Sequence, residues 1–283
     1  MNTKSYHPAP APGVFPPSPP VPTPPREESR KEPRETERNQ LEPVSELLDV
    51  VSSKSFNIRA VQGRYLSEQQ VVNIIKVYLL AYLALEKRNL PTRNAIFLPC
   101  HTGTETTYGT IGPNVAIRNW FSVQVANPNE TTELELAFRR RGASISTGNR
   151  GNRTSPNADS NPSGVKNAAF LDNNENDALK KMVELQLDLV YGAPSSSFEA
   201  VAPFKPIGLA IAQNNITPHR FGEKIGEAYA GQGTPEATAY PSRFIACHGQ
   251  VHGVLSRFFT AFPDSVSDTT KTWARNTLAA MAR

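Results

Sequence analysis

One stretch of the chain, residues 71–85, is apolar on nearly every side of a helix, and it constrains the fold more than any other feature. Ser67 and Gln70 precede it with the spacing of a capping box, so we expect a helix to begin there and to end near Lys87. A helix that is apolar all round is buried. The sequence therefore predicts a domain whose other elements pack around this helix.

The same stretch is too short to cross a membrane. A spanning helix needs about 20 predominantly apolar residues, and this one is interrupted by Asn73 and Lys76. The N-terminus has prolines where a secretory signal needs an apolar run, and its only early cation is Lys4. We expect neither export nor a membrane partner.

Proline is concentrated in one part of the chain. Of the 25 prolines among 283 residues, 12 lie in residues 1–44, where segments such as PPVPTPP favour an extended polyproline II conformation. Such a segment cannot bury enough apolar surface to fold by itself. We predict a disordered Pro-rich arm over residues 1–44 and a folded domain over residues 45–283.

The folded part carries mainly helix signals. Apolar residues at helical spacing predict a helix from Asn174 to Tyr191, which Gly192 ends. Three more helices, which begin at Thr-Pro, at Tyr-Pro and at an aspartate, are expected over 217–230, over 240–262 and from 268 onwards. With at most a little strand around residues 117–137, the predicted fold class is mainly α, a helical bundle.

A long segment rich in glycine, serine and asparagine interrupts these helices over about residues 139–168. A loop of this length inside a domain is usually functional or disordered. Six cations lie in it against Asp159 alone: Arg139, Arg140, Arg141, Arg150, Arg153 and Lys166. In a chain of net charge +4, this local excess predicts a flexible basic insertion that meets a polyanion.

The two cysteines, Cys100 and Cys247, are too few and too far apart in the chain for a disulfide framework or a four-cysteine zinc site. This indicates a reducing compartment. The side chains of the neighbours Cys100 and His101 diverge, so they cannot by themselves form a nucleophile and its base.

His248 and His252 share one helix face, but the metalloprotease pattern needs glutamate where Gly249 stands. We predict that both histidines are packing residues. We also expect no cofactor, no bound metal and no catalytic residue.

Arginines stand next to aromatic residues in the last three expected helices. On single-stranded nucleic acid, guanidinium groups meet phosphates and rings stack on bases. The alternative is that the rings belong to the core and the arginines to a solvated surface. The pairs are Arg220-Phe221, Arg243-Phe244, Arg257-Phe258-Phe259 and Trp273 with Arg275.

Three short motifs carry a family resemblance. They are residues 66–72 followed by Leu-Pro-Thr at 90–92, the box Arg-Phe-Phe-Thr-Ala-Phe-Pro-Asp at 257–264, and Trp-Ala-Arg-Asn-Thr at 273–277 before Met281. The chain resembles the coat proteins of flexuous filamentous plant viruses, of the potexvirus, carlavirus and potyvirus type, over roughly residues 64–125 and 200–283.

The resemblance implies an α-helical subunit that polymerises into a helical filament, holds genomic RNA in a groove and links to its neighbour through the N-terminal arm. It implies a location in the virion and the host cytoplasm. By motif, the family's RNA-contacting arginine corresponds to Arg220 and its aspartate to Asp264, which would orient an arginine. The family's serine has no clear match, and Thr102 or Thr104 could take its place.

We therefore predict a non-enzymatic viral coat protein whose partners are single-stranded RNA and further copies of itself. The predicted RNA-binding residues are Arg220, Lys224, Arg243, Arg257, Phe258, Phe259 and Asp264, with Arg139, Arg140, Arg141, Arg150 and Arg153 as additional candidates. Two alternatives stay open. One is a nucleoprotein or a Pro/Ala/Ser-rich RNA-coating protein of another virus group, and the other is a hydrolase that uses Cys247 or Cys100 with a histidine.

Overall fold

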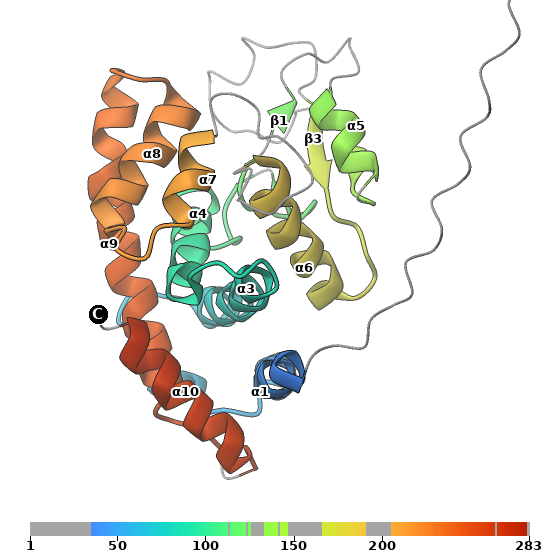
Figure 1. The fold of residues 1–283 in the computed structure, drawn as a ribbon, viewed down its shortest axis with the longest axis vertical. Helices are drawn as coiled ribbons and strands as arrows, with labels where there is room; N and C mark the ends of the chain where they lie inside the picture. Colours follow the sequence, from blue (N-terminus) through green and yellow to red (C-terminus); the bar gives the residue numbers. More distant parts are fainter. Residues whose placement is uncertain are drawn as a thin grey trace, which may run out of the picture. The chain divides into compact units, whose positions relative to one another are not determined.

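The computed structural model describes residues 35–112, 114–122, 124–125, 133–140, 142–146, 166–190, 205–263 and 265–281. Only the backbone is described for some of these, including 35–41 and Arg140. The chain divides into two compact units, Met1–Arg34 and Glu35–Arg283, and the second contains every described residue. This second unit is mainly helical, as the sequence predicts (Figure 1).

The elements of the helical unit follow in chain order: α1 (Glu35–Ser52), α2 (Ile58–Val61), α3 (Glu68–Glu86), the 3₁₀ helix η1 (Thr92–Ile96), α4 (Phe97–Thr106), β1 (Gln124–Val125), α5 (Glu133–Arg140), β2 (Ser144–Ser146), β3 (Lys166–Ala169), α6 (Glu175–Leu185), the π-helix η3 (Gln186–Val190), α7 (Lys205–Ile211), α8 (Pro218–Ala230), α9 (Pro235–Phe258) and α10 (Asp268–Met281). Among the described helices, none combines the length and the apolar character that crossing a membrane requires.

The predicted apolar helix, α3, lies in the middle of this unit. Both hydrogen bonds of its capping box form: the Gln70 N–H donates to Ser67 Oγ (3.2 Å), and the Ser67 N–H donates to Gln70 Oε1 (2.7 Å). Nearly every residue from Val71 to Leu85 is buried. Helices α1, α4, α6 and α9 pack around α3, which explains this burial (Figure 1).

The two polar residues that interrupt the apolar run have partners. Lys76 Nζ lies 2.6 Å from Glu175 Oε2 in the first turn of α6, and Asn73 Nδ2 donates to the Tyr108 carbonyl oxygen (2.7 Å). These contacts compensate the cost of burying polar groups. They also attach α6 and the segment after α4 to defined positions along α3.

Helix α9 begins earlier than the sequence predicts. The Thr234 hydroxyl accepts a hydrogen bond from the Ala237 N–H (3.1 Å), and Pro235 occupies the first position, where its missing N–H costs nothing. The helix then continues through Tyr240 and Pro241, where the prediction placed its start. The correction follows from the cap, because Thr234 provides a stronger start signal than Pro241.

The strands lie partly outside the region where strand was expected. β1 falls within residues 117–137, but β2 lies inside the segment predicted to be a loop and β3 overlaps the end of that segment. They form an antiparallel sheet of order β1-β3-β2, with Gln124 opposite Asn167. Elements this short have too few positions to display the alternation that predicts a strand. Residues 147–165 of the predicted insertion lie outside the described residues.

The predicted boundary at residue 44 is corrected to residue 34. Helix α1 begins at Glu35, so residues 35–44 belong to the helical unit, and Val44 is fully buried. The proline and charge counts did not predict this helix start, because a helix that ends in an apolar stripe can begin with an entirely polar turn. The rest of the predicted arm, Met1–Arg34, lies outside the described residues.

Helices α8 and α9 approach each other closely at Gly226. A Cβ on this residue would stand 2.8 Å from the Ala237 carbonyl oxygen and 2.7 Å from Tyr240 Cβ. We predict that Gly226→Ala lowers the free energy of unfolding by about 1–3 kcal/mol in urea denaturation, because the helices must move apart.

Gly249, also in α9, is the matched control, since a Cβ there would meet no atom within 4 Å. Gly249→Ala is expected to raise stability by roughly 0.5–1 kcal/mol, because alanine favours the helix. Similar effects of the two substitutions would contradict the close packing of α8 on α9.

Candidate nucleic-acid interface

Two cavities meet on helix α9 at Gly249. The larger, of about 540 Å³, lies between α9, η1, the start of α8 and the end of α10. Its lining includes Arg93 of η1, Thr217 at the N-cap of α8, and His248 and His252 of α9.

The smaller cavity, of about 340 Å³, lies between α9 and the loop that precedes α3. Its lining includes Arg64 and Tyr65 from the loop and Gln250 and Arg257 from α9. Gly249 lines both cavities, and a Cβ at this position would meet no atom within 4 Å, so no side chain of α9 separates them there. We call the two cavities together the α9 groove.

The α9 groove is lined by three arginines and two histidines. Arg64, Arg93 and Arg257 contribute guanidinium groups, and His248 and His252 contribute imidazoles. None of the described residues that line either cavity is an aspartate or a glutamate. A concave surface with charges of one sign concentrates ligands of the opposite sign. The groove is therefore suited to a polyanion.

Two of its arginines can engage a ligand without first giving up a protein partner. In the described part of the chain, the side chains of Arg93 and Arg64 make no hydrogen bond and no ion pair. The Arg64 guanidinium lies 5.8 Å from the centroid of the Tyr65 ring, which is 82% exposed. An exposed ring beside a guanidinium group offers a base a face to stack on and its phosphate a cation to meet.

Arg257, a predicted RNA contact, lines the groove and also has a structural role. Its Nε donates to the carbonyl oxygen of Val61, the last residue of α2 (2.9 Å). A Cβ on Gly63 or on Gly253 would come within 3.1 and 3.4 Å of its terminal nitrogens. Arg257 therefore holds the loop before α3 against α9, and the two glycines leave room for its guanidinium group.

Arg64, Tyr65 and Arg93 were not among the predicted contacts, because the prediction relied on cations beside aromatic residues in the last three helices. It also assigned His248 and His252 to packing alone. Both are partly buried, but they line the larger cavity. In the described residues, no group of three or more His, Cys, Asp or Glu is placed to hold a metal ion.

Phe258 and Phe259 were predicted to shape the RNA groove, and the structure corrects this. Both side chains are buried, with exposed fractions of 0% and 1%. Phe258 packs edge-on against Phe56 (5.3 Å between centroids), and Phe259 packs edge-on against Trp273 (5.9 Å). A ring enclosed on both faces cannot stack on a base, so these residues belong to the core.

The predicted cations of α8 are already paired within their own helix. Arg220 Nη1 lies 2.6 Å from Glu223, and Lys224 Nζ lies 2.7 Å from Glu227. Arg243 is exposed on α9, three residues before Ala246 and seven before Gln250, which line the smaller cavity. This spacing places Arg243 on the same helix face as these two residues, but Arg243 lines neither cavity.

The other predicted contacts lie away from the groove or outside the described residues. Arg139 pairs with the buried carboxylate of Glu135 (2.9 Å) on its own helix, α5. The Arg140 side chain is not described, and the remaining predictions lie outside the described residues: Arg141, Arg150, Arg153 and Asp264.

The two cysteines occupy surroundings that disfavour a thiolate. Burial raises the pKa of the Cys100 thiol well above its ordinary value and also raises the pKa of Cys247. Burial lowers the pKa of His101 to about 3. A hydrolase that uses a cysteine needs a thiolate nucleophile and a base that titrates near neutral pH. The two thiols and His101 have the opposite properties.

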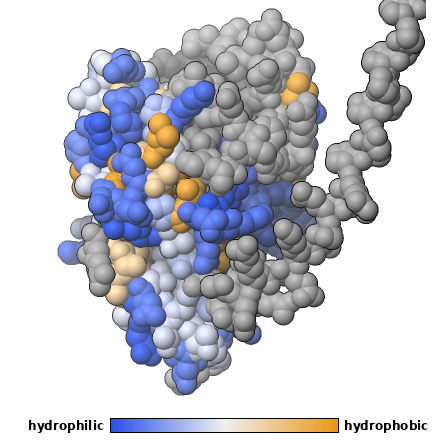
Figure 2. Space-filling model, in the orientation of Figure 1, coloured by the Kyte–Doolittle hydropathy of each residue, from blue (hydrophilic) through white to orange (hydrophobic). Residues whose placement is uncertain are grey.

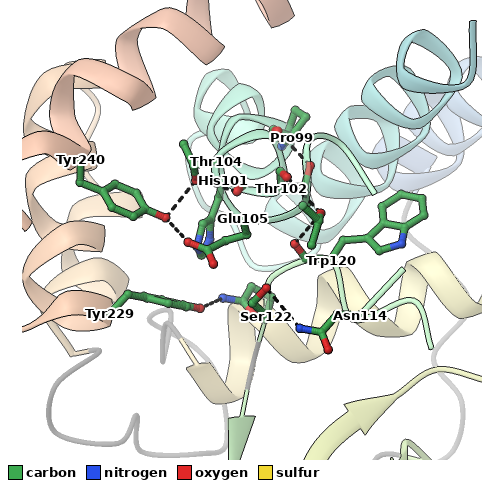
Figure 3. Close-up of polar contacts among 12 residues, drawn as sticks. Pro99, His101, Thr102, Thr104, Glu105, Asn114, Trp120, Ser122, Tyr229 and Tyr240 are labelled. Atoms are coloured by element: carbon green, nitrogen blue, oxygen red, sulfur yellow. Dashed lines mark hydrogen bonds and ion pairs between the residues drawn. The ribbon is translucent and has the colours of Figure 1, made fainter. Parts of the chain in front are cut away.

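A buried polar cluster joins α4 to the α8–α9 pair (Figure 3). The Tyr240 hydroxyl of α9 donates to the Glu105 carboxylate of α4 and lies 2.9 Å from the Thr104 hydroxyl. His101 of α4 packs edge-on against Tyr229 of α8 (4.8 Å between centroids). Burial raises the pKa of Glu105. The cluster fixes the two helices against α4.

Comparison with known proteins provides no independent assignment for this site, because no protein-family model, no curated protein and no solved structure matches the chain. The resemblance to flexuous-virus coat proteins therefore rests on the short motifs in the sequence. The function has to be argued from the geometry and charge of the α9 groove.

The burial of His101 predicts acid-sensitive stability. Its pKa is about 3 in the folded chain and about 6.5 in an unfolded chain, so only the unfolded state takes up a proton as the pH falls below about 6.5. We expect the free energy of unfolding to decrease by roughly 2 kcal/mol through this group between about pH 7.5 and pH 5. Urea denaturation at several pH values measures this decrease.

His101→Gln should be less stable at neutral pH but should lack this part of the pH dependence. His219, which is exposed and lies 3.5 Å from Glu223, is the matched control. His219→Gln is expected to keep the full decrease. An unchanged pH dependence in His101→Gln would show that the acid sensitivity has another origin.

Proposed function

We propose that this protein is a viral coat protein that packages single-stranded RNA and uses the α9 groove to hold the RNA backbone. The observation that carries the proposal is a concave surface that contains three arginines and no acid among its described lining residues. Phosphate groups supply most of the affinity of nucleic-acid binding. Guanidinium groups without ion-pair partners, such as Arg64 and Arg93, are suited to bind them.

The shape of the site favours a single strand. Tyr65 is almost fully exposed and stands at the mouth of the smaller cavity, where an unpaired base could stack on its ring. In a duplex, the bases stack on each other and offer no free face. Gly249 leaves the path across α9 open, so one strand could contact Arg64 and Arg93 on opposite sides of the helix.

Self-assembly, the second part of the proposal, requires surfaces that another copy can cover. Figure 2 shows apolar residues over α7 with polar residues around them, and Leu209 of this helix is 64% exposed. A second exposed apolar side chain is Ile245 of α9, which is 45% exposed. A coat subunit would bury such side chains against its neighbours in the filament.

A nucleoprotein or RNA-coating protein of another virus group would use the same groove and is the nearest alternative. Micrographs distinguish the two, because only the coat-protein proposal requires regular flexuous rods. The hydrolase alternative is disfavoured by the raised pKa values of both thiols.

Removing the two unpaired arginines should weaken RNA binding. For Arg64→Ala/Arg93→Ala, we expect a lower affinity for oligouridylate. We also expect the slope of log affinity against log salt to become shallower by about 0.7 for each phosphate that no longer meets a cation. Fluorescence anisotropy at several salt concentrations measures both quantities.

The control variant is Lys54→Ala/Lys180→Ala, which removes the same charge from exposed positions that line neither cavity. It should bind RNA nearly as the unmodified protein does. If the two double variants weakened binding equally, binding would be a general charge effect and the α9 groove would not be the site. If the unmodified protein bound no single-stranded RNA, the proposal itself would be wrong.

The filament proposal predicts a different outcome for the first unit. Deleting Met1–Arg34 should leave the helical unit folded, because every described core residue lies in Glu35–Arg283. Under the proposal the arm links neighbouring subunits, so the deletion should abolish filaments. Circular dichroism and negative-stain microscopy test the two statements separately, and filaments of unchanged length would contradict the linking role.

A further inference from the structure

We propose that His248, with His252 beside it in the larger cavity, couples RNA binding in the α9 groove to proton uptake, so that the groove binds single-stranded RNA more tightly in mild acid than at neutral pH. This inference rests on the proposed function. It adds a regulation of the same site, namely an affinity for the RNA phosphates that depends on pH.

The first support is the position of the two rings. His248 and His252 lie one turn apart on α9, with ring centroids 6.3 Å apart and planes inclined by 28°. Both line the larger cavity. A phosphate group in this cavity would therefore face two imidazoles beside Arg93.

The second support is the absence of a competing carboxylate. Of the described residues that line the cavity, η1 contributes Arg93 as its charged group, while α8 and α10 contribute Thr217, Pro218 and Met281, which do not titrate. The nearest polar contact of His252 is the hydroxyl of Ser256, 3.4 Å from Nδ1. No acid among these described lining residues stabilises an imidazolium, so a bound phosphate would supply the missing negative charge.

The third support is the charge state of the empty groove. Burial and the neighbouring His252 lower the pKa of His248 to about 4. The ring is therefore neutral at pH 7 when no anion is bound. A phosphate opposes both effects and raises the pKa towards or beyond its ordinary value of about 6.5. Since the RNA complex then binds one more proton than the free protein, its affinity must increase as the pH falls.

The size of the effect follows from these values. With a pKa of about 4 in the free protein and about 6.5 in the complex, the affinity should be about tenfold higher at pH 5.5 than at pH 7.5. Each proton taken up also adds a cation at the phosphates. The salt dependence should therefore become steeper by about 0.7 in the slope of log affinity against log salt.

The experiment titrates the full-length protein with oligouridylate that carries a fluorophore without a titratable group, at both pH values and several salt concentrations. Uracil is used because it does not titrate in this range. His248→Gln/His252→Gln should show nearly equal affinities at the two pH values. His219→Gln, the matched control outside the cavity, should keep the tenfold gain. A gain of the same size in the double variant would overturn the proposal, as would the absence of a gain in the unmodified protein.

A second measurement avoids dependence on the folding of the double variant. Proton NMR of the unmodified protein should show the His248 ring titrating at a higher pH when oligouridylate is present than when it is absent. An unchanged titration in a saturated complex would overturn the coupling while leaving RNA binding intact. The absence of binding at every pH and salt concentration would instead overturn the proposed function, and this inference with it.

Discussion

Complete burial of α3 is the constraint on which the other elements depend. A helix with apolar residues on all sides is destabilised wherever it meets water, so neighbours must cover its entire circumference. Helices α1, α4, α6 and α9 do this. The few polar atoms on α3 then select among the ways of covering it. Lys76 has its carboxylate partner only if the first turn of α6 lies beside it, and Asn73 has its acceptor only if the chain turns back after α4.

Helix α9 connects this core to the candidate site. Its buried side, with Phe244, Val251 and Phe258, belongs to the core. Its opposite side carries Gly249, where two cavities meet, and the two histidines of the larger cavity. The cluster of Glu105, Tyr240 and their neighbours attaches α9 to α4 through hydrogen bonds. A groove built on rigid helices keeps its cations at fixed positions, which a binding site for a repeating polymer requires.

Local signals predicted much of the fold. The caps and helix-terminal residues of α3, α6, α8 and α10 act within one turn, so they can be read directly from neighbouring residues. Prediction failed where the decisive partner is distant in sequence. The strands β2 and β3 are too short to show a pattern, and residues 35–44 are helical although Val44, which is buried in the core, lies at the very end of this segment. The groove was half predicted: Arg257 was identified, but Arg64 and Arg93 come from segments without a motif.

The sequence by itself determined a mainly helical chain with one fully buried helix, separated from a Pro-rich segment, with more cations than acids in its helical part. These properties follow from composition and periodicity, which do not depend on how the helices are arranged. Only the tertiary structure decided which cations share a surface. Arg220 and Lys224 are neutralised by glutamates one turn away, and Phe258 and Phe259 are enclosed by other rings. Arg64 and Arg93 come near Arg257 and Gly249 of α9 because the loop before α3 and the helix η1 pack against this helix, and no local rule relates residues so far apart in the chain.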